Sequence, residues 1–354
     1  MNKNFHYSPS PTPFRVCLSW IYRLGVKAIR FGYRTRLLQT RTLGCPVISI
    51  GNIAVGGTGK TPLVELLASE LSSQFPLAIV TRGFKSQSEH RNVRIDIEEP
   101  NGSSLYGDEP MLLSLKTKVP VFVGKNRFKS GLMAIEEGAK CILLDDGMQH
   151  RKLHRDLEIA IVDAKDPFCS HRFLPAGFLR DEVSALKKAD VIIALSVCNE
   201  KEYCAVRKKL RAVSEAPLVG MYKQPIWTHD VKKVGLFCGI GKPEQFVETV
   251  RDLKLDIVDT LFSLDHKVPS FEELHGYALS CKAKGAEALI CTEKDQIKLV
   301  SKELPLPVLA LPIVLKVAQG KEAWEKFLKT VVKKVNCHER PGESPSSKAR
   351  RKHS

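Results

Sequence analysis

No apolar run in this 354-residue sequence is long enough to cross a bilayer. The longest apolar stretch without a charge, residues 304–315, has 12 residues and contains three prolines. A membrane-spanning helix needs about 20 apolar residues. Hydrophobic residues still make up 43% of the chain and charged residues 27%, so the composition excludes disorder of the whole chain. We expect a globular protein, and the length favours two domains.

Closely spaced cysteine pairs are also missing. The ten cysteines are scattered between Cys17 and Cys337, and no two of them form a C-x-x-C pair. Metal frameworks and redox motifs need such pairs, so the pattern predicts reduced thiols in a cytosolic protein. The N-terminus has no continuous apolar segment followed by a small-residue cleavage site, and we therefore expect no secretory signal.

Acidic residues are absent from the first 50 positions, which hold eight lysines and arginines. The last 20 residues contribute +3, so only +5 of the net charge of +16 falls on residues 51–334. Basic ends indicate an anionic partner, either a nucleic acid or an anionic membrane surface. A nucleic-acid-binding protein would carry basic and aromatic residues across a folded face, or a known binding module. The sequence has neither, so we expect no nucleic-acid partner.

Residues 13–33 have the pattern of an amphipathic helix. Apolar residues recur at helical spacing, and basic residues recur at the same spacing about 120° away. This arrangement is typical of a helix that lies on an anionic bilayer, and the alternative is a terminal helix docked on the protein's own core. The apolar stripe consists of Cys17, Ile21, Leu24, Ala28 and Phe31, and the basic stripe of Arg23, Lys27, Arg30 and Arg34.

From residue 46 onward, short β-branched runs alternate with helical patterns. Strands are predicted at 47–50, 77–80, 121–123, 141–144, 159–162 and 191–195, and helices at 61–71, 127–138 and 180–188. Apolar strands separated by helices predict a parallel sheet covered on both faces. After a linker at 224–233, a smaller α/β unit is predicted, with strands at 235–238, 256–260, 288–291 and 308–311. The tail, 339–354, is rich in Ser, Pro and basic residues and is predicted to be disordered.

A glycine-rich segment follows the first predicted strand and precedes a predicted helix. It matches the phosphate-binding pattern G-x-x-x-x-G-K-[ST], except that alanine replaces the first glycine. Glycines let successive N–H groups point at phosphate oxygens, and the helix N-terminus adds partial positive charge. The lysine is predicted to reach the β- and γ-phosphates and the last threonine to ligate Mg²⁺. The predicted nucleotide-binding residues are Ala54, Val55, Gly56, Gly57, Thr58, Gly59, Lys60 and Thr61.

Two carboxylates, Asp145 and Asp146, end the predicted strand at 141–144. In P-loop proteins an acidic residue at such a strand end lies beside the phosphate loop and holds Mg²⁺. We therefore predict that one of the two holds the metal, and the alternative is a solvated Asp-Gly turn. From the residues alone, Asp108 and His266 have ordinary explanations, a helix start and a structural histidine.

In combination, the motifs resemble the tetraacyldisaccharide 4′-kinase family, enzymes of the lipid A pathway in Gram-negative bacteria. They occur in the family's order over about residues 15–330, and the missing first glycine of the phosphate loop is usual in the family. The motifs are GN at 51–52, VGGTGKTP at 55–62, TRGF at 81–84, GDEP at 107–110, DDGMQH at 145–150, LPAG at 174–177, GIGKPEQF at 239–246, DH at 265–266 and TEKD at 292–295.

The resemblance implies transfer of the γ-phosphate of ATP to the 4′-hydroxyl of a tetraacylated glucosamine disaccharide 1-phosphate, with Mg²⁺ as the metal. It implies two α/β lobes with the active site between them. By position, Asp108 resembles the general base, His266 its dyad partner from the second lobe, and Asp145 and Asp146 the metal-site acids. Residues that resemble the phosphate and substrate channel are Arg82, Glu109, His150 and Arg180, and residues 292–295 are expected near the nucleotide base.

Four positions depart from the family pattern, which usually has Phe, Pro, Glu and His where this chain has Met148, Phe178, Asp181 and Lys267. Another P-loop small-molecule kinase, or a GTPase-type switch that reads its base through 292–295, is the competing prediction. The basic, apolar helix suits a substrate whose acyl chains stay in a bilayer, so we expect attachment to the cytoplasmic face of the inner membrane. The expected domains are a membrane-docking helix (1–40), a P-loop kinase domain (41–223), a smaller lobe that closes over the site (224–335) and a basic tail (336–354).

Overall fold

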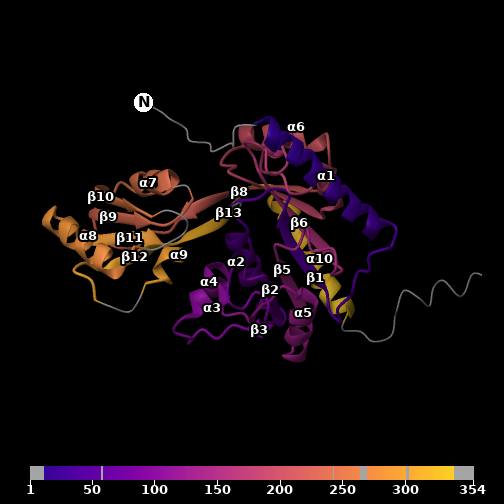
Figure 1. Cartoon of the computed structure of the whole chain (residues 1–354), viewed down its shortest axis with the longest axis horizontal. Helices are drawn as coiled ribbons and strands as arrows, with labels where there is room; N and C mark the ends of the chain where they lie inside the picture. Colours follow the sequence, from indigo (N-terminus) through magenta and orange to yellow (C-terminus); the bar gives the residue numbers. More distant parts are fainter. Residues whose placement is uncertain (1–11, 57–58, 242, 264–268, 300–302, 339–354) are drawn as a thin grey trace, which may run out of the picture.

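The chain folds around two separate β-sheets, which Figure 1 shows side by side and joined through strands β8 and β13. The structure is a computed structural model, and it describes residues 12–56, 59–241, 243–263, 269–299 and 303–338. The predicted class, a parallel-sheet α/β protein with a second, smaller α/β unit, is confirmed.

The larger sheet has nine strands in the order β13-β8-β7-β6-β1-β5-β2-β4-β3. All neighbours pair in parallel except the two edge strands β13 and β3, which are antiparallel. Crossover helices link the parallel strands, as the alternating sequence pattern predicts. The strands are β1 (Val47–Asn52), β2 (Leu77–Thr81), β3 (Val93–Arg94), β4 (Val121–Val123), β5 (Cys141–Asp145), β6 (Leu157–Asp163), β7 (Val191–Leu195), β8 (Leu218–Pro225) and β13 (Ile313–Gln319).

Helices cover both faces of this sheet, which is why its strands read as continuous apolar runs. Successive side chains of a strand point to opposite faces. In β5, for example, Leu143 packs in the core under α2, α4 and α10, whereas Ile142 packs under α5. Helix α6 covers the remainder of that second face. The helices are α2 (Lys60–Leu71), α3 (Gly102–Tyr106), α4 (Asp108–Thr117), α5 (Arg127–Glu136), α6 (Glu200–Arg211) and α10 (Lys321–His338).

One predicted helix, residues 180–188, is wrong. Only Val183–Lys188 is helical, as the short 3-10 segment η2, and a second 3-10 segment, η1, spans Cys169–His171. Residues 180–182 instead run alongside the segment that follows β1, because the N–H groups of Arg180 and Asp181 both donate to the Ile53 carbonyl oxygen, at 2.9 and 3.2 Å. Long-range backbone pairing has therefore replaced the local helical pattern.

The smaller sheet has four parallel strands in the order β10-β9-β11-β12. Apolar residues of α7 and α8 pack in the two cores of this unit. Its elements are β9 (Lys233–Cys238), α7 (Pro243–Asp252), β10 (Asp256–Phe262), α8 (Phe271–Ala283), β11 (Ala288–Thr292), α9 (Glu293–Gln296) and β12 (Val308–Leu311).

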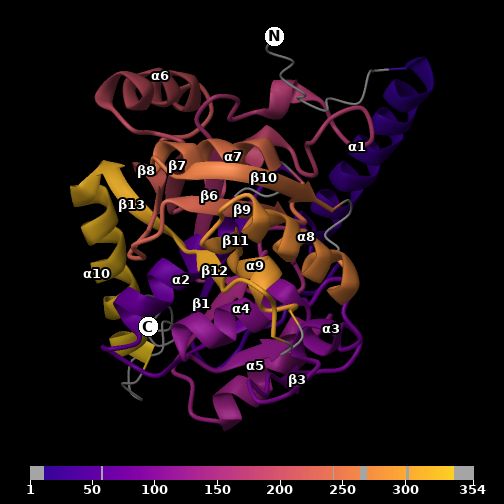
Figure 2. The ribbon, with the colours of Figure 1, turned by 90° about the vertical axis from the view of Figure 1, so that its left-hand side faces the viewer.

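The predicted boundary of the smaller lobe, 224–335, is wrong at both ends. Strand β8 continues to Pro225, and β13 pairs with it in antiparallel register as the last strand of the larger sheet. Helix α10 then packs against the larger sheet through Trp324, Phe327 and Val331, and Figure 2 shows it beside β13. The chain thus returns to the first lobe, because the apolar stripe of α10 is buried only there.

Helix α1 (Pro13–Arg34) lies along the outside of the larger lobe (Figures 1 and 2). All five residues of its apolar stripe are exposed, and the exposed fractions of Ile21, Leu24 and Phe31 lie between 62% and 65%. The alternative prediction, that this stripe docks on the core, is therefore wrong. None of the helices in the described part of the chain combines the length and apolarity that crossing a membrane requires.

Candidate active site

The candidate site begins where β1, the central strand of the larger sheet, meets α2. Gly59 is the N-cap of α2, so Lys60 and Thr61 stand at the positive end of that helix. Gly56 and Gly59 have φ angles of 113° and 73°, which glycine adopts without strain. A Cβ atom on Gly59 would also lie only 2.5 Å from a Leu195 methyl carbon. The sequence-predicted residues Gly57 and Thr58 lie outside the described residues.

Ala54, which replaces the usual first glycine, is paired with another extended segment of the chain. It forms an isolated antiparallel bridge with Leu179, and the Val55 N–H donates to the Phe178 carbonyl oxygen at 2.8 Å. A residue in extended pairing needs no glycine, which explains why alanine is tolerated here. Residues 178–182, which we call the strap, therefore lie directly against the phosphate loop.

The two predicted metal-site aspartates stand next to this loop, because β5 pairs with β1. Asp145 ends β5, and its Oδ2 accepts a hydrogen bond from the Thr81 hydroxyl at 2.8 Å. Asp146 accepts hydrogen bonds from both terminal nitrogens of Arg180, and the Lys60 Nζ lies 3.6 Å from its Oδ1. The structure thus brings Lys60, both aspartates and Arg180 together.

The pKa values of the two carboxyl groups move in opposite directions. Burial, with the neighbouring charges of Glu109 and Asp146, raises the pKa of Asp145 to about 6. Burial acts in the same direction on Asp146, but the hydrogen bonds and charge of Arg180, with the charge of Lys60, outweigh it and lower the pKa to about 2. Asp146 is therefore firmly ionised, whereas the Thr81 hydrogen bond and the charge of Lys60 do not offset the burial of Asp145.

These donors fit a magnesium ion, and they distinguish between the two aspartates. The Oδ1 of Asp145 is buried and has no hydrogen-bond partner among the described residues, whereas both oxygens of Asp146 are engaged by Arg180. Mg²⁺ is bound through one or two carboxylates together with phosphates and water. Among the described residues, no group of three or more His, Cys, Asp and Glu side chains is arranged to hold a metal ion.

Asp108 and Glu109 begin α4 and face the smaller lobe. The Lys298 Nζ lies 2.6 Å from the Asp108 Oδ2, and Lys294 forms an ion pair with Glu109. Burial would raise the pKa of Glu109, but the charges of Lys294 and Lys60 outweigh it and lower that pKa. Neither lysine partner is predicted from the sequence: Lys294 lies in the 292–295 motif, which is expected near the nucleotide base, and Lys298 lies outside it. The predicted dyad partner His266 lies outside the described residues.

Basic residues also lie near the aspartates, since the charges of Asp145 and Asp146 act on Arg127. Arg82 is paired with Glu89, at 2.6 Å between Nε and Oε1. Burial, with the charges of Arg127 and neighbouring basic residues, lowers the pKa of His150 to about 4. Arg127, at the start of α5, is not among the sequence-predicted site residues; it is only 6% exposed, and burial lowers its pKa to about 10. Its place at the start of a predicted helix gave no functional signal.

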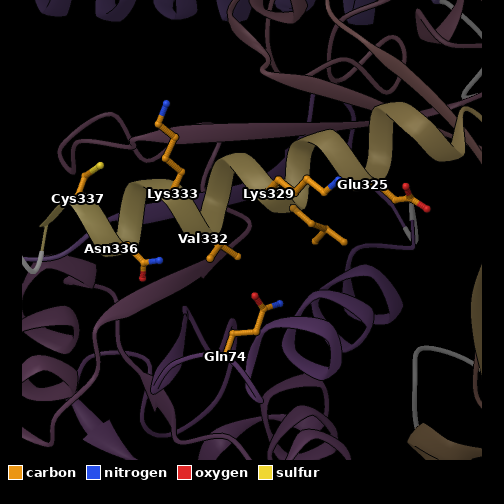
Figure 3. Close-up of a pocket in the computed structure, with 8 residues that line it drawn as sticks. Gln74, Glu325, Lys329, Val332, Lys333, Asn336 and Cys337 are labelled. Carbon is orange, nitrogen blue, oxygen red and sulfur yellow. The ribbon is translucent and has the colours of Figure 1, made fainter.

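One cavity in the described part of the chain lies away from these residues. It has a volume of about 610 Å³ and runs along α10 between Gln74 and Cys337, as Figure 3 shows. Its lining residues include none of the predicted site residues. The candidate site is thus defined by the strand ends and the phosphate loop, and not by this cavity.

A parallel sheet whose central strand leads through a glycine loop into a helix, with carboxylates at the neighbouring strand end, defines a P-loop kinase fold. The profile of the tetraacyldisaccharide-1-P 4′-kinase family (LpxK) matches residues 13–333. The chain belongs to this family.

Individual relatives agree with this assignment. The tetraacyldisaccharide 4′-kinase of Chlamydia pneumoniae is 37% identical, over 72% of this chain and 72% of its own length. That of Syntrophus aciditrophicus is 32% identical, over 88% of this chain and 91% of its own length. A crystal structure of Aquifex aeolicus LpxK with ATP aligns with a TM-score of 0.70 and 28% identity, covering 89% of this chain and 97% of that one.

Proposed function

We propose that this protein transfers the γ-phosphate of ATP to the 4′-hydroxyl of tetraacyldisaccharide 1-phosphate, giving the 1,4′-bisphosphorylated lipid A precursor. The observation that carries the proposal is the position of Lys60 at the N-terminus of α2, 3.6 Å from a carboxylate at the end of the neighbouring strand. Phosphoryl transfer depends mainly on positioning and on neutralising charge, and this arrangement supplies both. Family membership supplies the acceptor.

In the proposed reaction Asp108 accepts the proton of the acceptor hydroxyl as the new bond to phosphorus forms. The Lys298 Nζ lies 2.6 Å from the Asp108 Oδ2 and holds that carboxylate in place. Since Lys298 comes from the smaller lobe, approach of the lobes would assemble this pair. His266 remains the predicted dyad partner of Asp108, and Lys60 the ligand of the β- and γ-phosphates.

Mg²⁺, when bound, neutralises charge on the transferring phosphate. We assign the metal to Asp145 and Thr61, because the Asp145 Oδ1 is buried and has no hydrogen-bond partner within the described residues. Asp146 then has a different task. It is held by Arg180 and orients the Lys60 ammonium group. The channel roles of Arg82, Glu109, His150 and Arg180 belong to the same proposal.

The protein is further proposed to attach to the cytoplasmic face of the inner membrane through α1. Contiguous exposed apolar surface on a soluble protein marks an interaction site, and the stripe of α1 is exposed along the whole helix. The acceptor carries four acyl chains, which remain in a bilayer. An anionic lipid surface therefore fits both the apolar stripe and the basic N-terminal segment.

A GTPase-type switch is the weaker alternative. A base-reading aspartate has to offer its carboxylate to the guanine ring. Asp295 is 1% exposed, and its Oδ2 accepts hydrogen bonds from the Thr292 hydroxyl and the Gly239 N–H. The Oδ2 of that carboxylate is therefore engaged inside the protein, beside the Thr292 cap of α9.

The proposal is tested with labelled ATP, Mg²⁺ and tetraacyldisaccharide 1-phosphate in detergent, followed by analysis for a 4′-phosphorylated product. Asp108→Ala is expected to lower kcat by a factor of about 10² to 10⁴ while ATP still binds. Lys60→Ala is expected to lower kcat and to weaken the binding of ATP. Lys129→Ala, an exposed lysine on α5, serves as the control. Near-normal turnover of Asp108→Ala would remove the general-base assignment. ATP consumption without dependence on the lipid would remove the function itself.

A further inference from the structure

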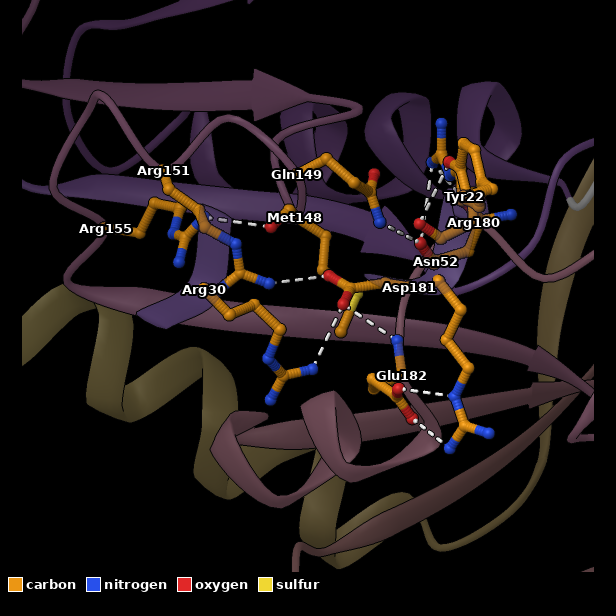
Figure 4. A network of polar contacts seen from close by, with 11 residues as sticks. Tyr22, Arg30, Asn52, Met148, Gln149, Arg151, Arg155, Arg180, Asp181 and Glu182 are labelled. Carbon is orange, nitrogen blue, oxygen red and sulfur yellow. Dashed lines mark hydrogen bonds and ion pairs between the residues drawn. The ribbon is translucent and has the colours of Figure 1, made fainter. Parts of the chain in front are cut away.

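Helix α1 contacts the rest of the protein through charged and polar residues of its inner side. Arg23 pairs with Glu182 at 2.8 Å, and Arg30 pairs with Asp181 at 3.1 Å. The Tyr22 hydroxyl donates to the Arg180 carbonyl oxygen at 3.2 Å. All three contacts fall on consecutive residues of the strap, and Figure 4 labels Tyr22 and Arg30 beside them. Two residues of the predicted basic stripe thus face the protein's own acids.

The burial of Asp181 strengthens the contact between α1 and the strap. Its side chain is only 2% exposed and lies between two guanidinium groups, Arg30 at 3.1 Å and Arg151 at 2.7 Å. Removal of one partner from a buried ion pair leaves a costly uncompensated charge. The strap is therefore held in place from two sides, by α1 and by the loop that follows β5.

The strap also forms hydrogen bonds with two parts of the candidate site, the phosphate loop and Asp146. Its backbone pairs with the start of the phosphate loop, from the Val55 N–H to the Phe178 carbonyl oxygen at 2.8 Å, and with the residue just before it, from the Arg180 N–H to the Ile53 carbonyl oxygen at 2.9 Å. Its Arg180 side chain engages both oxygens of Asp146. Asp146 is the carboxylate that lies 3.6 Å from the Lys60 ammonium group.

We propose that Arg23 and Arg30 are positioning residues for phosphoryl transfer, which hold the strap so that Arg180 stays on Asp146 and the phosphate loop keeps its shape. The inference rests on the proposed function and goes beyond it, because it gives α1 a task in turnover that is separate from any attachment to a membrane. When the strap is released, Arg180 leaves Asp146, and Asp146 then draws Lys60 away from the phosphates. A misplacement of this kind lowers kcat more than it changes the affinity for the acceptor.

The test exchanges the charges of the more exposed pair, Arg23 and Glu182. Arg23→Glu and Glu182→Arg, each alone, are expected to lower kcat about tenfold in detergent with the KM for the acceptor unchanged. The double exchange restores opposite charges and is expected to bring kcat back to within about threefold. Arg15→Glu makes the same change on the same helix at a residue with no ion pair in the described chain, and kcat is expected to stay unchanged.

Hydrogen exchange gives a second measurement that does not depend on catalysis. In Arg23→Glu, the amides of residues 53–55 and 178–182 are expected to exchange about tenfold faster, and the double exchange is expected to return them to the parent rate. Equal effects of Arg15→Glu and Arg23→Glu, or single-variant losses that the double exchange does not restore, would overturn the proposal. If the parent protein does not phosphorylate the lipid, the proposed function fails, and the exchange rates alone decide whether α1 holds the strap.

Discussion

At the residue scale, the two adjacent aspartates show how position divides the tasks of identical side chains. Asp146 is neutralised by Arg180 and its pKa falls to about 2, whereas burial raises that of Asp145 to about 6. At the end of β5 the chain directs the Asp146 carboxylate to Arg180 and Lys60, and it leaves one Asp145 oxygen with no hydrogen-bond partner in the described part of the chain. The sequence predicts a metal site at this pair of aspartates, but it does not show whether Asp145 or Asp146 holds the metal.

This division leads to a prediction about magnesium. Asp145→Asn is expected to raise the Mg²⁺ concentration required for half-maximal turnover by about 10- to 100-fold, because a ligand is lost. Asp146→Asn is expected to lower kcat with a smaller change in that concentration, because it releases Arg180 and Lys60. Turnover titrated against Mg²⁺ measures both. A larger shift in Asp146→Asn than in Asp145→Asn would reverse the assignment.

A second prediction at this scale concerns His150 and pH. Its pKa in the folded protein is lowered to about 4, whereas its ordinary value is 6.5. Between these values the unfolded chain binds the additional proton, so the stabilisation is complete above pH 6.5 and is lost as the pH falls toward 4. His150→Gln is therefore expected to lose less stability than the parent between pH 7 and pH 4.5 in urea unfolding.

The control for this measurement is His154→Gln, because the side chain of His154 is 51% exposed. This variant is expected to follow the parent across the same pH range. If His150→Gln and the parent had parallel stability profiles, the histidine would not contribute to the acid sensitivity of the fold.

At the element scale, α1 shows that an amphipathic pattern fixes the helix but not which face meets the protein. Arg23 and Arg30 of the basic stripe turn inward to acidic partners, and the apolar stripe turns outward. The sequence periodicity is the same whether the basic stripe or the apolar stripe of the helix faces the protein. Only the positions of Asp181 and Glu182, about 150 residues further along the chain, decide between them.

The outward stripe predicts vesicle binding that depends on apolar residues. Leu24→Gln combined with Phe31→Gln removes two side chains that are each 62% exposed, so the fold is expected to keep its stability. Cosedimentation with anionic vesicles is expected to fall at least tenfold, because apolar burial contributes to the binding free energy. The matched control is Leu279→Gln on α8, whose side chain is 51% exposed. Equal binding by the variant and the control would remove the membrane assignment.

At the scale of the whole molecule, the two lobes meet where α9 approaches α4. Lys116 of α4 lies 2.8 Å from Glu65 of α2 and 2.8 Å from Glu293 of α9. The Ser103 hydroxyl also donates to the Ile297 carbonyl oxygen at 3.3 Å. Together with the Lys298–Asp108 pair, these contacts place the proposed base at the junction of the lobes. The return of β13 and α10 to the first lobe gives the smaller lobe two connections to it.

Lys116→Met tests this junction. The variant leaves Glu65 without its cation, and burial is already the largest influence raising the pKa of that carboxyl group. The free energy of unfolding is expected to fall by about 1–3 kcal/mol, and hydrogen exchange in α9 is expected to accelerate. Lys129→Met on α5 provides a control with an exposed lysine. Unchanged exchange in α9 would show that Lys116 does not couple the lobes.

The sequence by itself determined the parallel sheet and the phosphate loop, because both depend on local order along the chain. Apolar runs of five or six residues form strands wherever they are buried, and Gly56, Gly59 and Lys60 take their roles from adjacent residues. Only the tertiary structure decided what depends on distant partners: the strap in place of the helix at 180–188, the return of β13 and α10, and the partners of Asp108, Asp146 and Arg23. Each of these contacts joins segments that are far apart in sequence, and a local pattern carries no information about them.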